Sequence, residues 1–299
     1  MDINRSNIDA LFKSVVTAFQ GGVQQKPPVD LGFCVSPFAS TTAANYYPWL
    51  EAIPGFREWI GDRQFQNLRS QKFEVANRDF ELSLAMPAKD VEDDQYGMYA
   101  GLVSQVAANW PLQRYELLVE VLTNRVKAWD GKLLGATDHV YGANTIANLV
   151  TGALTKTTFE TAFTTAAGWK FSNGKPCRTR WTHLLYGPKL SAAVFDLILN
   201  RYTNDGTATT SVQVENRNYQ KVTPVECPDF VGAYDDYWVL LDCSQALKPL
   251  LTQTRKTPVV TMTTDLERIA EHGEIKIMAD GRAAAAPTFF HLAYIGAVS

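Results

Sequence analysis

The sequence predicts an α+β fold. Segments with helical and with strand-like apolar spacing follow one another without the regular strand–helix–strand alternation of a doubly wound sheet. Hydrophobic residues make up 46% and charged residues 20% of the 299 positions, a globular balance that excludes a disordered chain. We find neither a low-complexity segment nor a fixed-period repeat, which excludes a solenoid.

A first helix is predicted over residues 8–19, where apolar residues recur at helical spacing until the glycine pair 21–22 ends it. An amphipathic helix cannot bury its own apolar face, so this helix must dock on another surface. Phe12 and Phe19 on its apolar face are therefore candidates for contacts between subunits.

Residues 23–54 are broken by five prolines yet rich in aromatic and other apolar side chains, Trp49 among them. Such a segment is poor linker material. It indicates an extended arm laid over apolar surface, either its own or that of a neighbouring chain, with Trp49 as a candidate contact.

A β-ribbon is predicted next, with strands over residues 63–69 and 72–86 around a polar turn at residues 70–71. Its apolar residues change parity near Arg78, which indicates a bulge or a change of buried face. A hairpin alone is marginally stable in water, so a projecting ribbon needs a partner. Alternatively, the charged residues around the ribbon form a solvent-exposed face and make no contact with a partner. The charged candidates for inter-subunit contacts are Arg63, Arg69, Lys72 and Arg78, followed by the acidic run Glu92, Asp93 and Asp94.

A long helical unit is predicted from Met98 to Lys127, with Pro111 either kinking one helix or opening a second that Asn109 caps. The turn at residues 130–131 ends it. Further along we expect a Thr-capped helix over 155–167, strands over 181–186, 237–241, 273–278 and 289–295, a helix over 190–199 and a polar loop over 203–208.

The charge and the cysteines exclude several classes of function. The formal net charge is -3, with 28 basic against 31 acidic residues, which argues against a dedicated nucleic-acid binder. The polar N-terminus does not predict a signal peptide, and no segment approaches the roughly 18 apolar residues of a membrane span. The four cysteines are far apart in sequence, so we expect reduced, buried thiols and neither a metal site nor a cofactor.

No catalytic motif is recognisable: the chain lacks a phosphate-binding loop, a dinucleotide fingerprint, a zinc-protease helix and a nucleophile elbow. The adjacent pair Asp138 and His139 is the one crude acid–base candidate, and a cytosolic hydrolase using it is the alternative hypothesis. Adjacent residues seldom point at one reacting atom, and no second pair completes a site. We therefore predict a protein that is not an enzyme.

An ordered series of short motifs carries a family resemblance. The motifs are FQGG (19–22), YPWL (47–50), REWIGDR (57–63), VANRDFE (75–81), EDDQYG (92–97), DG (130–131), TDH (137–139), WVLLD (238–242) and LKPL (247–250). Together they resemble the major head subunit of Mu-like phages and prophages, over nearly the whole chain except residues 200–222. Each motif alone is weak, but the ordered series is specific.

The resemblance implies the Hong Kong 97-type capsid fold of tailed phages and a division into its domains. Residues 1–48 would be the N-terminal arm and 49–88 the extended β-hairpin loop. Residues 89–149 with 246–299 would form the peripheral domain, whose long spine helix Pro111 interrupts. Residues 150–245 would form the axial domain.

The implied function is self-assembly into hexamers and pentamers that form an icosahedral shell around double-stranded DNA. Implied partners are further copies of the chain, a scaffolding protein, a portal, decoration proteins and non-specifically bound DNA on the inner face. The site would be the virion, after assembly in the host bacterial cytoplasm. Since the chain opens on Met1, we expect an unprocessed subunit with a separate scaffold. The alternative within this fold is an encapsulin-like protein compartment.

Overall fold

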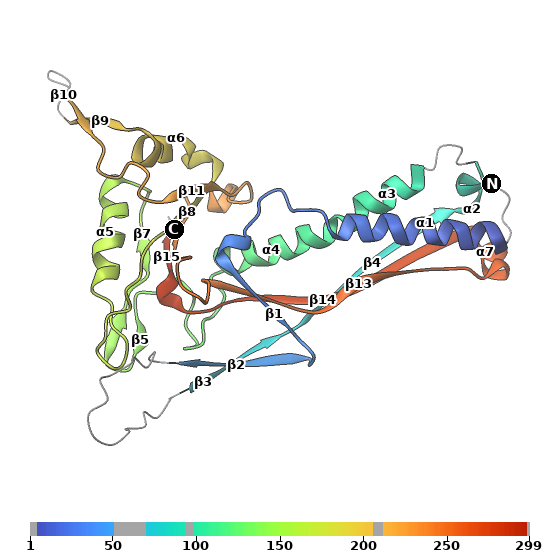
Figure 1. The fold of residues 1–299 in the computed structure, drawn as a ribbon, viewed down its shortest axis with the longest axis horizontal. Coiled ribbons are helices and arrows are strands. Elements are labelled where there is room, and N and C mark those ends of the chain that lie inside the picture. The colour runs from blue at the N-terminus through green and yellow to red at the C-terminus, as the bar shows by residue number, and fades with distance from the viewer. Residues whose placement is uncertain (1–4, 51–69, 94–97, 206–211, 298–299) are drawn as a thin grey trace.

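The computed structural model describes residues 5–50, 70–93, 98–205 and 212–297, and it has two parts arranged along one long axis (Figure 1). One part is an elongated layer of helices on a four-stranded sheet, and the other is a broader body around a five-stranded sheet. Helices and strands are mixed in both parts, which confirms the predicted α+β class.

The elongated part is built on the strand order β1-β13-β14-β4. Along β14, Ile275, Ile277 and Ala279 are buried while the residues between them are exposed, so the sheet has one apolar face. Helices cover that face. The elements are α1 (Arg5–Val23), β1 (Val35–Ala39), β4 (Arg78–Pro87), α2 (Ala88–Glu92), α3 (Met98–Ala107), α4 (Asn109–Thr123), β13 (Leu250–Met262), α7 (Leu266–His272) and β14 (Glu274–Pro287).

The broader body has the strand order β11-β8-β12-β15-β7, and its central strand β12 is buried along its whole length. The strands are β7 (Leu149–Thr151), β8 (His183–Tyr186), β11 (Thr223–Glu226), β12 (Trp238–Leu241) and β15 (Ala293–Ala297). Around them lie α5 (Lys156–Ala167), α6 (Ser191–Val194) with a π-helical turn over Phe195–Leu199, and the hairpins β5–β6 (His139–Tyr141, Asn144–Ile146) and β9–β10 (Tyr202–Asp205, Val212–Glu215).

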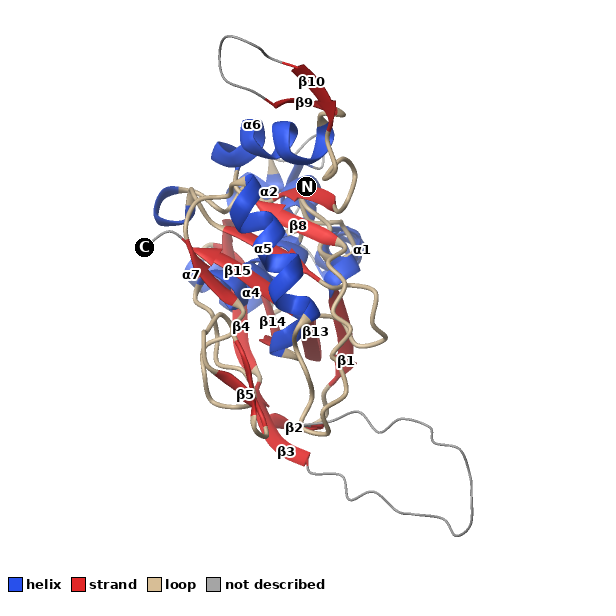
Figure 2. Ribbon diagram, turned by 90° about the vertical axis from the view of Figure 1, so that its left-hand side faces the viewer, coloured by secondary structure: helices blue, strands red, loops and turns tan. Residues whose placement is uncertain are grey.

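A two-stranded hairpin, β2 (Ala44–Leu50) with β3 (Ser70–Ala76), lies outside both large sheets. Viewed end-on, it and the β9–β10 hairpin occupy opposite edges of the molecule (Figure 2). The ribbon prediction needs correction here. Residues 70–71 are not a turn but the start of β3, and the described partner of β3 is β2, which the arm prediction left without a strand. The predicted strand over 63–69 lies outside the described residues.

The predicted change of buried face near Arg78 is confirmed, because the chain changes sheets there. Asn77 separates β3, which pairs with β2, from β4, which pairs with β14. The first predicted helix is also confirmed, although it continues through the glycine pair to Val23.

The predicted helical unit is two helices. The break is at Ala108, three residues before Pro111, and Pro111 lies in the first turn of α4. Of the two readings of Pro111, a second helix is therefore confirmed. Asn109 is not its cap, because Ala108 holds that position without a side-chain bond, and the helix ends at Thr123 rather than Lys127.

The Thr155 cap is confirmed: its side chain accepts a hydrogen bond from the backbone N–H of Thr158, and Thr158 answers it in a capping box. The helix over 190–199 and the strands near 183 and 238 are also confirmed. The polar loop at 203–208 is wrong for residues 203–205, which belong to β9; its last three residues are not described. In the predicted strand over 289–295, residues 290–292 form a 3₁₀ turn instead.

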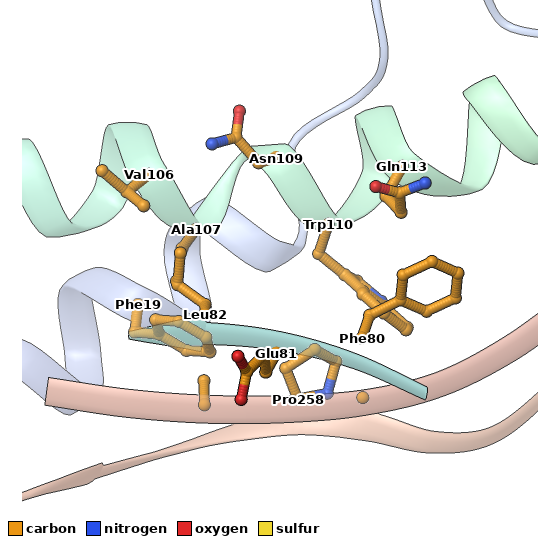
Figure 3. A pocket seen from close by; sticks show the side chains of 12 residues that line it. Phe19, Phe80, Glu81, Leu82, Val106, Ala107, Asn109, Trp110, Gln113 and Pro258 are labelled. Carbon is orange, nitrogen blue, oxygen red and sulfur yellow. The ribbon is translucent and has the colours of Figure 1, made fainter. Parts of the chain in front are cut away.

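One aromatic side chain packs the start of α4, just after the α3–α4 break, against the sheet. Trp110 reaches down from α4 beside Phe80 of β4, with the two ring centroids 6.3 Å apart, over a small apolar pocket of about 100 Å³ (Figure 3). Gly281 of β14 leaves the space for the indole. A Cβ there would lie 2.6 Å from Trp110 Cζ3 and 2.9 Å from Pro258 Cγ.

Gly281→Ala is expected to destabilise the unassembled subunit by about 1–3 kcal/mol, because the added methyl group overpacks the contact between Trp110 and the sheet. Urea unfolding followed by tryptophan fluorescence measures this. Gly101→Ala in α3 is the matched control: its Cβ would meet nothing within 4 Å, so we expect a gain of up to about 1 kcal/mol from helix propensity. Equal effects of the two substitutions would contradict the packing role of Gly281.

Candidate functional site

The acid–base pair suggested by the sequence does not form a site. His139 is fully buried, with Nδ1 2.6 Å from Asp130 Oδ2 and Nε2 3.0 Å from the carbonyl oxygen of Leu134. Its ring stacks on Phe290 at 4.2 Å between centroids. Asp138 instead is exposed and pairs with Lys132 at 2.7 Å. Both ring nitrogens of His139 are engaged, so it acts as a core residue, not as a general base.

His291 is a second buried histidine, and its Nδ1 lies 2.8 Å from the hydroxyl of Tyr141. Burial lowers the pKa of His291 to about 3, a shift that Asp242 partly opposes, and burial raises the pKa of Tyr141 well above its usual value. The imidazole is therefore neutral, and its Nδ1 shares a hydrogen bond with the hydroxyl of Tyr141. This pair, too, is packed inside the body, away from solvent.

Among the described residues there is no group of three or more His, Cys, Asp or Glu side chains arranged to hold a metal ion. In the same part of the chain no helix has the length and apolar character needed to cross a membrane. The four cysteines are all buried, and burial raises the pKa of each thiol.

The β2–β3 hairpin is the feature best suited to contact another molecule. One of its faces packs on the chain's own core through Tyr47, Phe73 and Val75. The opposite face exposes Tyr46 and Lys72, together with Pro48 and Glu74. Tyr46 is 62% exposed although it is aromatic, and among the described residues its two-stranded sheet has no further strand beside it. An isolated hairpin of this kind gains stability from a partner.

A hydrogen-bond cluster holds the root of this hairpin. Gln253 of β13 is fully buried; its amide oxygen accepts from Tyr47 Oη at 2.8 Å, and its amide nitrogen donates to the carbonyl of Val75 at 2.8 Å and to Asn77 Oδ1 at 3.0 Å. Asn77 Nδ2 donates in turn to Ser40 Oγ at 2.8 Å. The cluster thereby joins three segments that are distant in sequence: the end of β1 with β2, the end of β3, and β13. Sequence reasoning missed Gln253, because a glutamine in a polar run carries no local signal of burial.

The candidate contacts on the first helix have different surroundings. Phe19 is 3% exposed and packs in the core that α1 shares with α3 and the sheet, whereas Phe12 is half-buried at the margin of that core. Gly22 permits the close approach of α1 to α3, since a Cβ there would lie 2.2 Å from the carbonyl oxygen of Ser104 in α3. The surface on which the helix docks is thus within its own chain. Trp49 belongs to β2, where it pairs with Gln71.

Those charged candidates that the structure describes are spread over the molecule and form no single cluster. Lys72 is exposed on the hairpin, and Arg78 pairs with Glu120 of α4 at 2.6 Å, an exposed contact worth at most about 1 kcal/mol. Glu92 and Asp93 are exposed at the end of α2. Arg63, Arg69 and Asp94 lie outside the described residues.

The broader body also exposes apolar side chains that the sequence did not single out. Phe195 and Leu199 of the π-helical turn and Tyr202 of β9 are each close to half exposed. A π-turn shifts the helical register, which is why spacing alone could not tell which of these side chains face solvent.

Comparisons with known proteins agree with this architecture. The fold is similar to that of the procapsid subunit of bacteriophage JBD30, with a TM-score of 0.59 and 24% identity over 99% of this chain and 77% of that one. A family model described as the Mu-like prophage major head subunit gpT matches residues 8–153 and 218–297.

Two relatives are also similar in sequence. The Mu-like prophage FluMu major head subunit of Haemophilus influenzae is 26% identical over 260 residues, covering 86% of this chain and 62% of the relative. The major capsid protein of Escherichia phage Mu is 31% identical over 124 residues, 41% of this chain and 40% of the relative. The chain thus spans less than two thirds of the length of either relative.

An elongated helix-on-sheet part joined to a compact second body, with a hairpin beyond both, defines a capsid-type subunit of the Hong Kong 97 fold, as the sequence predicts. The chain belongs to the family of Mu-like prophage major head subunits of the gpT type. That family consists of structural head subunits and not of enzymes.

Gln253→Leu is expected to destabilise the unassembled subunit by about 2–4 kcal/mol, because the Tyr47 hydroxyl and the Val75 carbonyl lose their buried partner. Thr252→Val is the matched control one residue away. The buried Thr252 hydroxyl has no partner among the described residues, so its loss should be neutral or stabilising. Urea unfolding of both variants tests this, and a Gln253→Leu protein as stable as the parent would refute the role of the cluster.

The low pKa of His291 predicts a pH dependence of stability. Below about pH 6.5 the unfolded chain binds a proton at this residue and the folded chain does not, so stability falls as the pH falls towards about 3. Between pH 7.5 and 5.5 the loss from this one group should be about 1 kcal/mol. His291→Asn, which keeps an acceptor for Tyr141, should remove that component. If thermal unfolding of the parent protein and of His291→Asn showed the same dependence on pH, His291 would not be the source of the loss.

Proposed function

We propose that the chain is a major capsid protein, which self-assembles into hexamers and pentamers and so forms the icosahedral head shell of a Mu-like tailed phage. The observation that carries the proposal is the family match, which covers the elongated part, the β2–β3 hairpin and every strand of the five-stranded sheet except β8. The fold supports it independently, through its similarity to a procapsid subunit.

The shape of the subunit fits this task. A closed shell needs heterologous contacts that repeat around rings, and an elongated body with hairpins at opposite edges offers several such contacts per subunit (Figure 2). Each contact can be weak, because many of them act together. Burial of Tyr46 and its neighbours would supply affinity, and the exposed charges of Lys72, Glu92 and Asp93 would supply register more than energy.

We assign the domains as the resemblance suggests. Residues 1–48 form the arm, 49–88 the extended loop, 89–149 with 246–299 the peripheral domain, and 150–245 the axial domain. Within 246–299, β13 and β14 lie in the four-stranded sheet, whereas β15 pairs with β12 of the axial segment and with β7, which crosses the boundary between the two segments at residues 149–150. The five-stranded sheet therefore draws strands from both assigned domains.

The proposed partners are a scaffolding protein during assembly, a portal, decoration proteins and the packaged double-stranded DNA. With a net charge of -3, the subunit is suited to non-specific contact with DNA on the inner face rather than to tight binding. Assembly would take place in the host bacterial cytoplasm, and the product would be the virion capsid.

The alternatives are less well supported. The buried, fully bonded His139 disfavours a hydrolase that uses Asp138 and His139. An encapsulin-like compartment has the same fold type, but the head-subunit family favours a phage shell. Nucleic acid rather than enzyme cargo inside the particle would separate these two.

Tyr46→Ser tests the assembly role of the hairpin. The change removes an exposed ring, so the unassembled subunit should keep its stability to within about 0.5 kcal/mol while shell formation is lost or moves to roughly tenfold higher protein concentration. Sedimentation and negative-stain electron microscopy, with and without a co-expressed scaffolding protein, measure the outcome.

Tyr47→Phe at the neighbouring position is the control for this experiment. It removes a buried hydroxyl from the hairpin root and leaves the exposed face intact. It should therefore lower the stability of the subunit by about 1 kcal/mol and impair shell formation less than Tyr46→Ser does. A parent protein that stays monomeric or dimeric under both conditions would overturn the proposed function.

A further inference from the structure

Arg114 of α4 is a half-buried cation without a counter-charge. Its Nε is buried and has no hydrogen-bond partner, and within the part of the chain that the structure describes its guanidinium makes no ion pair. Burial lowers the pKa of Arg114, although an arginine side chain stays protonated in proteins. An unpaired buried charge costs stability, so the folded subunit carries an unfavourable term at this position.

The guanidinium lies in a cavity of about 330 Å³ between α4 and the segment that links α1 to β1. The lining is mixed. Its apolar side chains include Pro27, Val29 and Leu31 on the linking segment and Pro111 and Leu118 on α4, and its polar side chains include Gln24, Gln25, Tyr115 and Thr252. Lys26 supplies a second cation at the lining, and Asp30 a single carboxylate, whose Oδ1 accepts from the backbone N–H of Gly32 at 2.8 Å. A partly apolar recess with a cation in its lining suits an anion on a short apolar stem.

The chemistry of the cavity favours one carboxylate over a phosphate chain. A guanidinium binds a carboxylate through two parallel hydrogen bonds. A nucleic-acid backbone would instead need a run of exposed cations, whereas this cavity has two cations and an acid, set among apolar side chains. An aspartate or glutamate side chain has the charge and the short apolar stem that match.

The same molecule carries an excess of carboxylates at the end of its elongated part. We call this the acidic end: α2, α7 and the residues adjoining them, 88–93 and 265–274. Its acidic side chains outnumber Lys89 and Arg268, the basic residues of the same ranges. The exposed acidic residues there are Asp90, Glu92, Asp93, Asp265, Glu267, Glu271 and Glu274. In one chain this end lies well away from α4 (Figure 1).

We propose that Arg114 is the centre of a carboxylate-binding site that the acidic end of a second copy of this chain completes. The contact joins two different surfaces and is therefore heterologous, the kind that propagates around a ring. It rests on the proposed self-assembly and adds to it a specific device: a cation left unpaired in the free subunit and paired in the assembly. Pairing would favour the assembled state by relieving the cost of the buried charge.

Arg114→Leu separates this role from a merely structural one. Removing the unpaired charge should raise the melting temperature of the unassembled subunit by about 2–4 °C. The same change should raise the protein concentration needed for assembly by roughly tenfold, because the charge-assisted pair is lost. A more stable subunit that assembles at the parent's concentration would overturn the proposal and leave the proposed function intact. A parent protein that never assembles overturns the proposed function instead.

Arg114→Lys identifies the partner carboxylate. The carbodiimide EDC joins a lysine amine to a carboxylate in contact with it, with loss of water, and mass spectrometry locates the link. Assembly from mixed ¹⁴N and ¹⁵N subunits distinguishes links between copies from links within one chain. We expect a mixed-isotope link from position 114 to the acidic end. A link to Asp30 of the same chain, a link to any other region, or no link in assembled particles would overturn the proposal.

Discussion

The antiparallel pair β13–β14 is the interaction on which the rest of the structure depends. Its two strands pair from Leu250 with Pro287 beside the broad body to Met262 with Ile277 at the far end, with register shifts between Thr254 and Val259. β1 and β4 pair with its two edges, and the helices bury its apolar face. The root of the β2–β3 hairpin is hydrogen-bonded to Gln253 of β13, and Trp110 of α4 packs against Gly281 of β14. An extended pair of strands is a stiff support for segments that come from all over the sequence.

Stability in this subunit is distributed unevenly, and the distribution suits a protein that assembles. The broad body has a continuous core around the wholly buried strand β12, and the buried His139 and His291 each have a hydrogen-bond partner inside it. The hairpin exposes Tyr46, and the charged side chain of Arg114 lines a partly apolar cavity. Such features cost the free monomer stability and become favourable only when another surface covers them. The proposed assembly would therefore stabilise the folded subunit at these positions.

The pair Asp138 and His139 shows how adjacency in sequence can mislead about chemistry. In the short strand β5, successive side chains point to opposite faces, so His139 turns into the core and the residue before it remains at the surface. The functional partners are those that the fold brings together: Asp130 with His139, and Tyr47 with Gln253. Each is a pairing between residues on different elements, and no local pattern announces it.

The sequence alone predicts the α+β class, the first helix, an interruption of the long helical unit near Pro111, the Thr155 cap and the family, because each depends on local spacing, capping chemistry or an ordered series of motifs. It did not reveal β13, whose polar run with Pro258 lacks strand alternation, nor the alanine-rich half of β14, since alanine has low strand propensity. The pairing of β2 with β3, the burial of Gln253 and the lack of a partner for Arg114 Nε among the described residues became visible only in the tertiary structure. Pairing and burial depend on residues far apart along the chain, and the physical reason is that long-range packing, not local propensity, selects them.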